Sequence, residues 1–372
     1  MSKRSILILH ASVGQGHKTA ALALEEVLRD RGVTVVVEDL LDYALPVFKS
    51  IYADSYLELA ERAPDFMAML YKLTDRADSG FRKELISIIS RIGVPKFRGF
   101  GEGMYPDAIV HTHHLGMDLL KNTVTKIDPP IRNYCVVTDF AANSLWAHKE
   151  ISRYFVAGEL VKTMLVQRGI SPEKIEVSGI PLRSVVRTGK QPETVRTRLG
   201  ISKLPVITIL GAGLRDSKVR VMLQQMIRNG FSGTILIVCG RNEDLTDSIK
   251  DVSGAANLDI FTYGHIDYID DVMVASDIVV SKAGGLTVSE VLARGVPLIV
   301  VNGIRGQEEW NADFVCASGA GIQLHVSEML PYAVNRILND PERLNAMRSA
   351  ALRIGNPDAA VRVAEGILRD LP

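Results

Sequence analysis

Short apolar runs alternate with amphipathic stretches along most of this 372-residue chain. Such runs fit buried strands, and apolar positions three or four apart between them fit helices. The first half predicts a helix at Thr19–Arg31 and strands at Ser5–His10, Thr34–Val37, Asp107–Thr112, Asn133–Thr138 and Arg153–Ala157. The second half predicts helices at Asp216–Asn229, Thr287–Ala293 and Ala359–Arg369 and strands at Val206–Leu210, Thr234–Cys239, Leu258–Thr262, Asp277–Val280 and Leu298–Val301.

Two consecutive β/α series predict an α/β fold of two Rossmann-like, doubly wound domains that face each other across a cleft. We expect the first domain over residues 1–182 and the second over 205–355, joined by a charged, weakly periodic linker at 183–204. For the helical segment 356–372, one possible position is against the first domain. A chain of this length exceeds a usual single core, which also favours two domains.

Composition narrows the range of functions. Hydrophobic residues make up 47% of the chain and aromatic residues only 6%, so the core is mainly aliphatic, as in buried parallel sheets. Lys+Arg and Asp+Glu both total 43, which leaves no net field to attract nucleic acid. The three cysteines lack metal-ligand spacing and are expected to be buried free thiols. With no signal peptide and no membrane-spanning run, we expect a cytoplasmic protein or one on a membrane face.

Segment 43–103 departs from the β/α alternation. It holds an aromatic helical pattern and then a basic stretch, 81–100, whose apolar stripe consists of Leu85, Ile88, Ile89 and Ile92. A basic amphipathic helix with aromatic neighbours suits an anionic membrane interface. A helical insertion that covers its own domain explains this composition equally well.

Residues Ser281–Glu290 carry the clearest functional pattern. A strand leads into a small-residue turn and the start of a helix: Ala283, Gly284, Gly285, Leu286 and Thr287. The unpaired N–H groups at such a helix N-terminus favour an anion, and Lys282 adds a positive charge. Glu290, one turn into the helix, suits the two hydroxyls of a ribose. The segment therefore predicts a nucleotide site.

Three more loops at strand ends of the second domain fit the same ligand. Gly211 and Gly213 let the backbone approach a phosphate closely. Gly264 and His265 present backbone groups to a base. After the last strong strand come side chains that suit sugar hydroxyls, namely Gln307, Glu308 and Asn311. One such loop alone is an ordinary β/α turn, but several in one domain favour a ligand site.

In the first domain, Gly14-Gln15-Gly16-His17 precedes the first predicted helix. The positive end of the helix dipole favours a neutral His17, and a neutral imidazole can take a proton from an acceptor hydroxyl. The simpler alternative is a loop histidine that caps the helix. A dinucleotide site fits less well, because Thr19 stands where the Gly-x-Gly-x-x-Gly motif has its third glycine.

Polar residues also close the next two strands. His111 and His113 would share one strand face, but no carboxylate or cysteine joins them at ligand spacing, so we expect no metal there. We expect instead that one of these histidines lines the cleft. Asp139, with Trp146 and His148 further on, forms a second cluster. Asp139 either assists the base, orients the acceptor or caps a helix.

In their order along the chain these motifs resemble the monogalactosyldiacylglycerol synthase and processive diacylglycerol glucosyltransferase family. More distantly they resemble the N-acetylglucosaminyltransferase that makes peptidoglycan lipid II. The resemblance runs almost end to end and rests on Gly14–His17, Pro106-Asp107 with His113, Thr138-Asp139 with Trp146 and His148, Gly179–Arg183, Cys239–Asn242, Lys282–Gly285, and Gly306–Glu308 with Asn311. The chain departs from the family at Val13, at His114 and at Glu309-Trp310.

The resemblance implies a GT-B architecture and inverting transfer from a UDP-hexose, without a metal or other cofactor. It implies that the lysine-glycine turn holds the donor phosphates, Glu290 the ribose, and Gln307 and Glu308 the hexose. Arg241 is then a donor-side residue. His17 is the implied base, with Asp139 beside it, and the acceptor-side residues are Gly16, His113, Trp146 and His148.

The resulting hypothesis is hexose transfer from UDP-glucose or UDP-galactose to diacylglycerol, in glycolipid synthesis on the inner face of the cell membrane. The expected partners are a UDP-hexose, diacylglycerol or a related lipid, and an anionic membrane surface. Nucleic acid is not expected, and no oligomeric state is indicated. The rivals are transfer to another acceptor, a UDP-sugar epimerase of the same fold, and a non-catalytic UDP-sugar sensor.

Overall fold

The computed structural model describes residues 4–44, 106–117, 120, 131–254, 256–301 and 307–371. They form two compact units. The first comprises the described residues up to Ser184 together with Gln307 and 357–371, and the second comprises those from Val185 to 301 and from Glu308 to Asn356. The predicted insertion 43–103 lies outside the described residues except for Tyr43 and Ala44.

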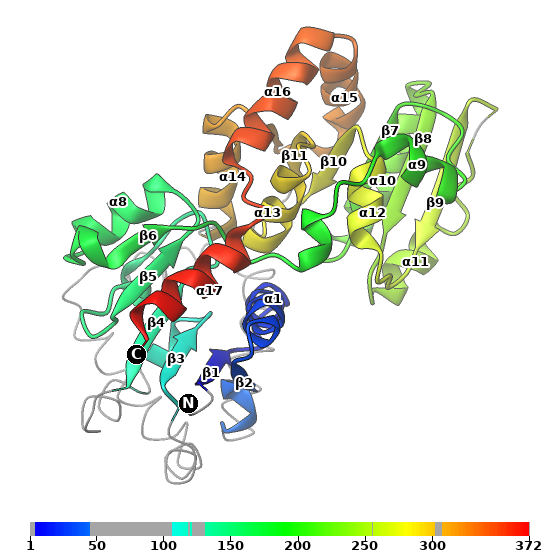
Figure 1. Cartoon of the computed structure of the whole chain (residues 1–372). Helices are drawn as coiled ribbons and strands as arrows, with labels where there is room; N and C mark the ends of the chain where they lie inside the picture. Colours follow the sequence, from blue (N-terminus) through cyan, green and yellow to red (C-terminus); the bar gives the residue numbers. More distant parts are fainter. Residues whose placement is uncertain are drawn as a thin grey trace. The chain divides into compact units, whose positions relative to one another are not determined.

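The first unit contains a parallel sheet with strand order β2-β1-β3-β4-β5-β6 (Figure 1). Ile8 of β1 pairs with Val37 of β2 on one side and with Val110 of β3 on the other. Its elements are β1 (Ser5–His10), α1 (Gly16–Asp30), β2 (Thr34–Asp39), η1 (Leu40–Asp42), β3 (Ala108–His111), β4 (Arg132–Val136), η3 (Ser144–Trp146), β5 (Arg153–Val156), α8 (Glu159–Gln167), η4 (Pro172–Lys174), β6 (Ile175–Val177) and α17 (Ala359–Asp370).

Strand β1 shows why the strands of this sheet have continuous apolar sequences. Ile6 and Ile8 point into a core shared with α1 and α17, whereas Leu7 and Leu9 point into a separate core with η1. Alternate side chains of a strand face opposite sides, so burial of both faces requires apolar residues at every position. Helix α17 approaches the sheet closely at Gly366, where a Cβ atom would lie 2.5 Å from the Phe155 ring.

The second unit contains a parallel sheet with strand order β12-β11-β10-β7-β8-β9. Its core holds Ile207 and Ile209 of β7 against Met222 of α10 and Val334 of α15. The elements are η5 (Ser184–Arg187), α9 (Pro192–Arg198), β7 (Val206–Leu210), α10 (Asp216–Arg228), β8 (Gly233–Val238), α11 (Glu243–Ile249), β9 (Leu258–Tyr263), α12 (Ile269–Ala275), β10 (Ile278–Ser281), α13 (Gly285–Ala293), β11 (Leu298–Val301), α14 (Gln307–Ala317), β12 (Gly321–Leu324), η6 (Ser327–Met329), α15 (Leu330–Leu338) and α16 (Pro341–Ile354).

The structure adds elements that the pattern did not predict. Strands β6 and β12 are edge strands of three and four residues, too short for a clear alternation. Helix α1 begins at Gly16 instead of Thr19, so His17 lies within the helix. The segment predicted as a linker, 183–204, contains η5 and α9.

A buried ion-pair network fixes this segment within the second unit. The Arg294 guanidinium donates to both carboxylate oxygens of Asp270, at 2.7 and 2.6 Å, and to the backbone carbonyls of Val185 and Thr188. Lys190 completes the network with contacts of 2.6 Å to Asp270 and 2.5 Å to Asp271. Charges buried in this way need such partners, so the network specifies where residues 185–190 lie on α12 and α13.

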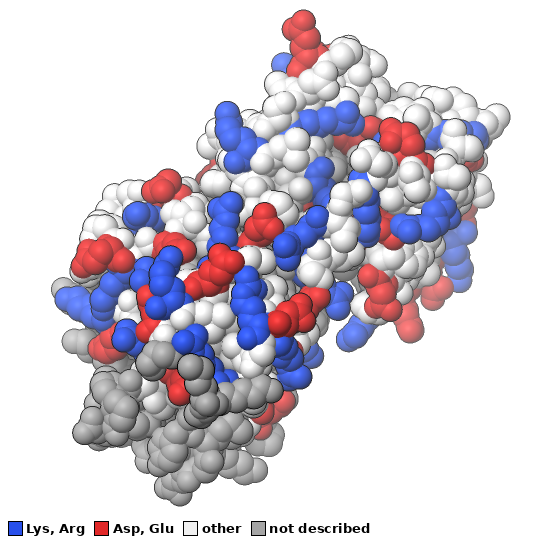
Figure 2. Space-filling view, viewed as in Figure 1, with Lys and Arg blue, Asp and Glu red and all other residues white. Residues whose placement is uncertain are grey.

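Charges of both signs intermix over the visible surface (Figure 2), as expected when acidic and basic residues are equal in number. Within the described part of the chain, no helix combines the length and apolar character needed to cross a bilayer.

Candidate functional site

Both sheets have a point where the strand order reverses. In the first unit it lies between β1 and β3, and in the second between β7 and β10. Doubly wound sheets bind ligands at the carboxyl ends of such neighbouring strands. The segments that follow these strands, including the first residues of α1 and α13, contain His17 and Thr112–His114 in the first unit, and Gly211–Gly213 and Lys282–Gly285 in the second. Some of the predicted residues of each unit therefore lie at its switch point, and the others follow neighbouring strands.

His17 is the second residue of α1, after Gly16, and it does not cap the helix. Its Nδ1 atom lies 2.9 Å from the backbone carbonyl oxygen of Thr112 and 2.8 Å from the hydroxyl oxygen of Thr138. Thr112 follows β3 and Thr138 follows β4, so the sheet brings three distant segments to one imidazole. The capping alternative is therefore not what the structure shows.

Burial lowers the pKa of His17 to about 4, an effect that the hydrogen bond to Thr112 partly offsets. The imidazole is therefore neutral near pH 7, as a proton acceptor must be. The sequence predicted a neutral His17 because of the helix dipole. In the structure, the leading cause of the lowered pKa of His17 is burial. Burial, and then the neighbouring His114 and His17, also hold the pKa of His113 well below its usual range.

Aromatic rings extend from His17 toward η3. The His17 and His113 rings meet edge to face with centroids 4.6 Å apart, and Trp146 lies 6.4 Å from His113. His114, the departure from the family motif, also contacts Trp146, at 5.7 Å. His148 lies beyond this group, with Nε2 placed 3.1 Å from the Leu145 carbonyl. The structure thus joins the predicted acceptor-side residues His113 and Trp146 to His17.

Asp139 is buried, and its carboxylate accepts a hydrogen bond from the side-chain amide of Gln307. Gln307 belongs to the first unit by its contacts, although it opens α14. Among the described residues, the hydrogen-bond partners of the His17 ring are Thr112 and Thr138, not Asp139. Asp139 as an aid to the base therefore stays a prediction.

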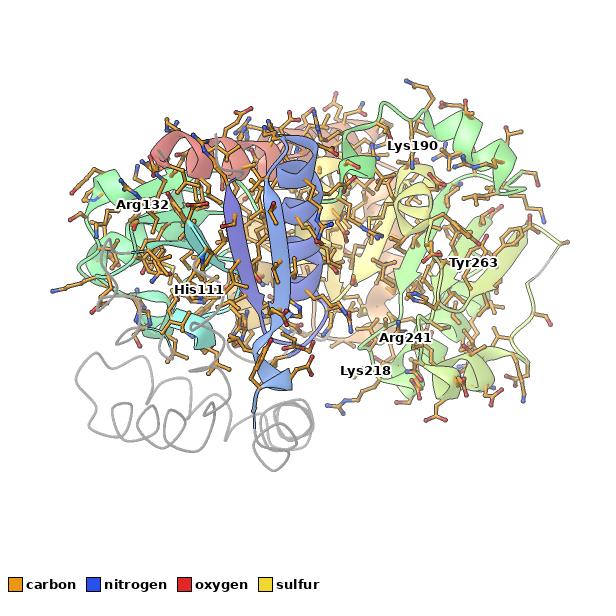
Figure 3. All side chains as sticks on the ribbon, turned by 60° about the horizontal axis from the view of Figure 1, so that its bottom comes forward. His111, Arg132, Lys190, Lys218, Arg241 and Tyr263 are labelled. Carbon is orange, nitrogen blue, oxygen red and sulfur yellow. The ribbon has the colours of Figure 1, made fainter. Side chains whose placement is uncertain are left out.

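His111 is fully buried within the first unit (Figure 3). Its Nε2 atom lies 3.0 Å from Asn133 Oδ1, and burial lowers its pKa to about 4. A Cβ atom on Gly116 would come within 2.5 Å of its Nδ1 atom. In the described ranges, no three His, Cys, Asp or Glu side chains come together as metal ligands.

The second unit brings together a lysine, a carboxylate and a glycine turn. Lys282 Nζ lies 3.0 Å from Glu308 Oε1, and a Cβ atom on Gly213 would come within 2.8 Å of Lys282 Cε. Gly213 also has φ +81°, a backbone conformation that favours glycine. Asn311 is buried and donates to the Ala283 carbonyl at 2.9 Å. Lys282, Glu308 and Asn311 thus connect the turn after β10 with α14.

Helix α13 begins at Gly285, and no acidic residue lies in its first turn. The backbone N–H groups of Gly285, Leu286 and Thr287 precede the first helical hydrogen bond, which Val288 donates to Gly284. Glu290 lies further along α13. N–H groups at a helix start that follows closely after Lys282 in the chain suit a phosphate group.

The remaining donor-side residues lie on the loops after β8 and β9. A Cβ atom on Gly264 would lie 3.7 Å from the Gly240 carbonyl, so the two loops adjoin. Arg241 and His265 are both exposed. Figure 3 shows Arg241 at the end of the second unit remote from Lys190.

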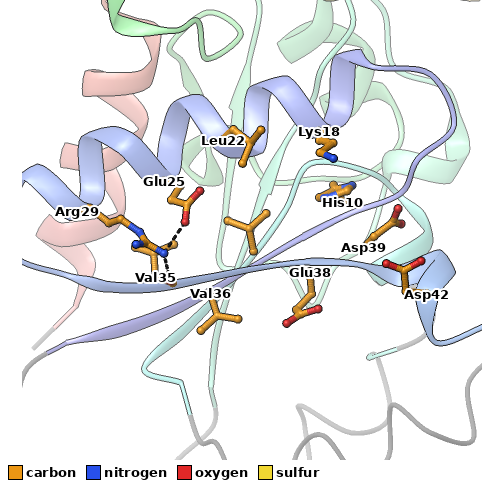
Figure 4. Close-up of a pocket in the computed structure, with 11 residues that line it drawn as sticks. His10, Lys18, Leu22, Glu25, Arg29, Val35, Val36, Glu38, Asp39 and Asp42 are labelled. Carbon is orange, nitrogen blue, oxygen red and sulfur yellow. Dashed lines mark hydrogen bonds and ion pairs between the residues drawn. The ribbon is translucent and has the colours of Figure 1, made fainter.

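A groove lined by α1 and β2 lies outside these clusters (Figure 4). Its lining is largely charged and includes His10, Lys18, Glu38, Asp39 and Asp42. Asp39 accepts from the backbone N–H groups of Ser12 and Leu41, which accounts for its position. None of the residues predicted as functional lines this groove.

Two contacts that hold the His17 ring were not predicted from the sequence. The Thr112 carbonyl is a backbone group that no side-chain pattern can reveal. Thr138 belongs to a polar pair, Thr138-Asp139, at a strand end, but nothing in the sequence connects it with a histidine 121 residues away.

Two family models match the chain. The model of monogalactosyldiacylglycerol (MGDG) synthase matches residues 17–182, and the model of the glycosyltransferase family 28 C-terminal domain matches residues 216–363. The first match begins at His17 and the second spans Lys282 and Glu308.

Curated relatives match over nearly the whole chain. The processive diacylglycerol beta-glucosyltransferase of Bacillus pumilus (strain SAFR-032) is 28% identical, over 93% of this chain and 90% of its own length. The enzyme of the same name from Bacillus cereus (strain B4264) is also 28% identical, over 98% of this chain and 93% of its own.

Solved structures share the fold at lower identity. MurG of Acinetobacter baumannii has a TM-score of 0.64 at 17% identity, covering 98% of this chain and 99% of that one. UDP-GlcNAc 2-epimerase of Neisseria meningitidis, bound to UDP-GlcNAc, has a TM-score of 0.62 at 14% identity, covering 98% and 100%. Together with the two parallel sheets, these matches confirm the GT-B type of two Rossmann-like domains. The family resemblance is confirmed by the two family models and the curated relatives: residues 17–182 match MGDG synthase and residues 216–363 match the glycosyltransferase family 28 C-terminal domain.

Proposed function

We propose that this protein transfers a hexose from UDP-glucose or UDP-galactose to the free hydroxyl of diacylglycerol, with inversion at the anomeric carbon. Its second unit binds the UDP-hexose, and its first unit deprotonates the lipid hydroxyl. The reaction takes place at an anionic membrane surface on the cytosolic side and yields a glycolipid and UDP.

One observation carries the proposal. Within the residues that match the MGDG synthase model, His17 has its pKa lowered to about 4 by burial, and its Nδ1 atom lies 2.9 Å from the Thr112 carbonyl oxygen. The fold alone does not favour transfer over epimerisation, because solved epimerases share it. The identity to diacylglycerol glucosyltransferases over nine-tenths of the chain does favour transfer.

In the proposed reaction, His17 takes the proton and UDP leaves with the bonding electron pair. His17 Nε2 accepts the proton of the lipid hydroxyl as its oxygen attacks the anomeric carbon of the donor. The bond from that carbon to the UDP oxygen breaks on the opposite face, and the electron pair leaves with UDP. Attack on the face opposite the leaving group inverts the anomeric configuration.

The second unit stabilises the leaving group in this proposal. The N–H groups at the start of α13 and the ammonium group of Lys282 neutralise charge that grows on the UDP phosphate during bond cleavage. Glu290 accepts from the ribose hydroxyls, and Gln307 and Glu308 bind hexose hydroxyls. Gly211, Gly213, Arg241, Gly264 and His265 contribute the remaining donor contacts.

The direct test uses the purified full chain with vesicles of dioleoylglycerol and anionic phospholipid. UDP-glucose, UDP-galactose and UDP-GlcNAc are supplied in turn, and the lipid extract is analysed by mass spectrometry and NMR. We expect a hexosyl-diacylglycerol of β configuration from one of the hexose donors. Vesicle flotation in the same preparation tests membrane binding.

Two results would reject the proposal. Epimerised UDP-GlcNAc without a lipid product would indicate the epimerase rival. Binding of UDP-hexose without turnover on any vesicle would indicate a sensor. Vesicles that lack diacylglycerol serve as the control for hydrolysis of the donor.

Lys282→Met is expected to weaken UDP binding about 10- to 100-fold, because a hydrogen bond to a charged group contributes roughly 1.5–3 kcal/mol. Isothermal titration calorimetry with UDP measures the change. Lys250→Met is the matched control, since Lys250 forms an exposed ion pair with Asp247 in the same unit. Equal UDP affinity in the two variants would remove Lys282 from the donor site.

A further inference from the structure

The tautomer of His17 follows from its contacts. A carbonyl oxygen only accepts hydrogen bonds, so Nδ1, at 2.9 Å from the Thr112 carbonyl, carries the hydrogen atom. In the neutral ring the lone pair then lies on Nε2. Among the residues that the structure describes, Nε2 has no hydrogen-bond partner, and His17 as a whole is half-buried. Nε2 is therefore the one ring nitrogen able to accept a proton.

The Thr138 hydroxyl reinforces this tautomer. Its oxygen lies 2.8 Å from His17 Nδ1 and 3.3 Å from the Thr112 carbonyl oxygen. The hydroxyl has one hydrogen atom, which it donates to the carbonyl, and its oxygen then accepts from the Nδ1–H group. Thr138 is only 4% exposed, so little water competes for these contacts.

Thr112 holds the backbone of the same histidine. Its hydroxyl donates to the His17 carbonyl oxygen at 3.0 Å. The neighbouring His113 has the opposite arrangement, because the Leu115 N–H group donates to its Nδ1 atom at 3.2 Å. The hydrogen of a neutral His113 is therefore on Nε2, so the two adjacent rings are held as different tautomers.

We propose that Thr138 is a positioning residue for His17: its hydroxyl, with the Thr112 carbonyl, holds the imidazole in the orientation and tautomer that leave Nε2 as the proton acceptor. This inference rests on the proposed function for its effect on turnover. The tautomer itself is a property of the free protein and is measurable without any substrate. Thr138 touches the base and not the reacting groups, as outer partners of a working histidine do.

The test compares Thr138→Val, which removes the hydroxyl at nearly constant shape, with Thr138→Ser, which restores it. Nitrogen-15 NMR of selectively labelled histidines reports the tautomer, and His17→Gln identifies the His17 signals among the eight histidines of the chain. Thr234→Val is the matched control. Thr234 is a fully buried threonine of the second unit that donates to the Lys203 carbonyl, and no histidine is among its recorded hydrogen-bond partners.

We expect wild type, Thr138→Ser and Thr234→Val to show one well-defined Nδ1–H tautomer. Thr138→Val is expected to show shifts averaged toward the Nε2–H form and a kcat about 3- to 10-fold lower, the effect of one lost hydrogen bond. KM for the UDP-hexose should not change. The His111 signals, governed by Asn133, should be the same in all variants.

Three outcomes would overturn the inference. One is an unchanged His17 tautomer and an unchanged kcat in Thr138→Val. Another is an equal loss in Thr138→Ser, because the hydroxyl would then not be the active element. The third is a rise in KM for the donor without a change of kcat. If the chain transfers sugar to no lipid, the proposed function fails, and the NMR comparison alone still decides the positioning role.

Discussion

His17→Ala is expected to lower kcat for hexose transfer by about 10²- to 10⁴-fold, the range that general-base catalysis contributes. The variant retains the second unit and its donor contacts, so UDP affinity should remain within twofold of wild type. Steady-state kinetics on diacylglycerol vesicles and calorimetry with UDP measure the two quantities. A kcat close to that of wild type would remove His17 from the mechanism.

The pH dependence of kcat is a second test of the role of His17. Since burial holds the pKa of His17 near 4, the imidazole is neutral above that value and cationic below it. A cationic ring has no lone pair to accept a proton, so kcat should be level from about pH 6 upward and fall as the pH drops toward 4. His325→Ala, which alters an exposed histidine of the second unit, should keep this profile unchanged.

Arg294→Ala is expected to destabilise the second unit by roughly 3–5 kcal/mol, because it leaves a buried carboxylate without its main partner. The Arg294 side chain is 9% exposed and that of Asp270 7%. The variant also removes the donors to the Val185 and Thr188 carbonyls. Urea unfolding measures the change, followed by fluorescence of Trp310 in a Trp146→Phe background, since the chain has two tryptophans.

Arg198→Ala is the control for this prediction. Arg198 contacts Asp271 at 2.5 Å in the same network, but its side chain is 59% exposed. An exposed ion pair contributes no more than about 1 kcal/mol, so the loss should be small. Equal destabilisation by the two variants would show that burial does not set the strength of these pairs.

The strands of both units were predictable because burial on two faces leaves a continuous apolar run. Val206–Leu210 and Leu298–Val301 have the predicted bounds, and β8 is displaced by one residue. The start of α1 was not predictable, since glycine and histidine are weak helix formers and Gln15 provides no side-chain cap. Tertiary contacts of His17 decide where that helix begins.

The candidate site was predictable as a set of residues but not as a set of contacts. The ion pair between Lys282 and Glu308 joins residues 26 positions apart, because α14 lies against the turn that follows β10, which no local pattern encodes. The tautomer of His17 depends on oxygens 95 and 121 residues away. Roles for Asp139 and for segment 43–103 remain predictions from the sequence.

Helix α17 has a consequence for how the protein is made. Ala360, Val363, Ala364 and Ile367 fill the same core as Ile6 and Ile8, although the entire second unit separates them in the chain. Because a ribosome synthesises proteins from the N-terminus, translation of the first unit begins before that of the second unit but ends after it. Until α17 has been synthesised, one apolar face of β1 has no helix packed on it and is a surface that chaperones can bind. The strands of the second sheet, β7 to β12, have all been synthesised by then.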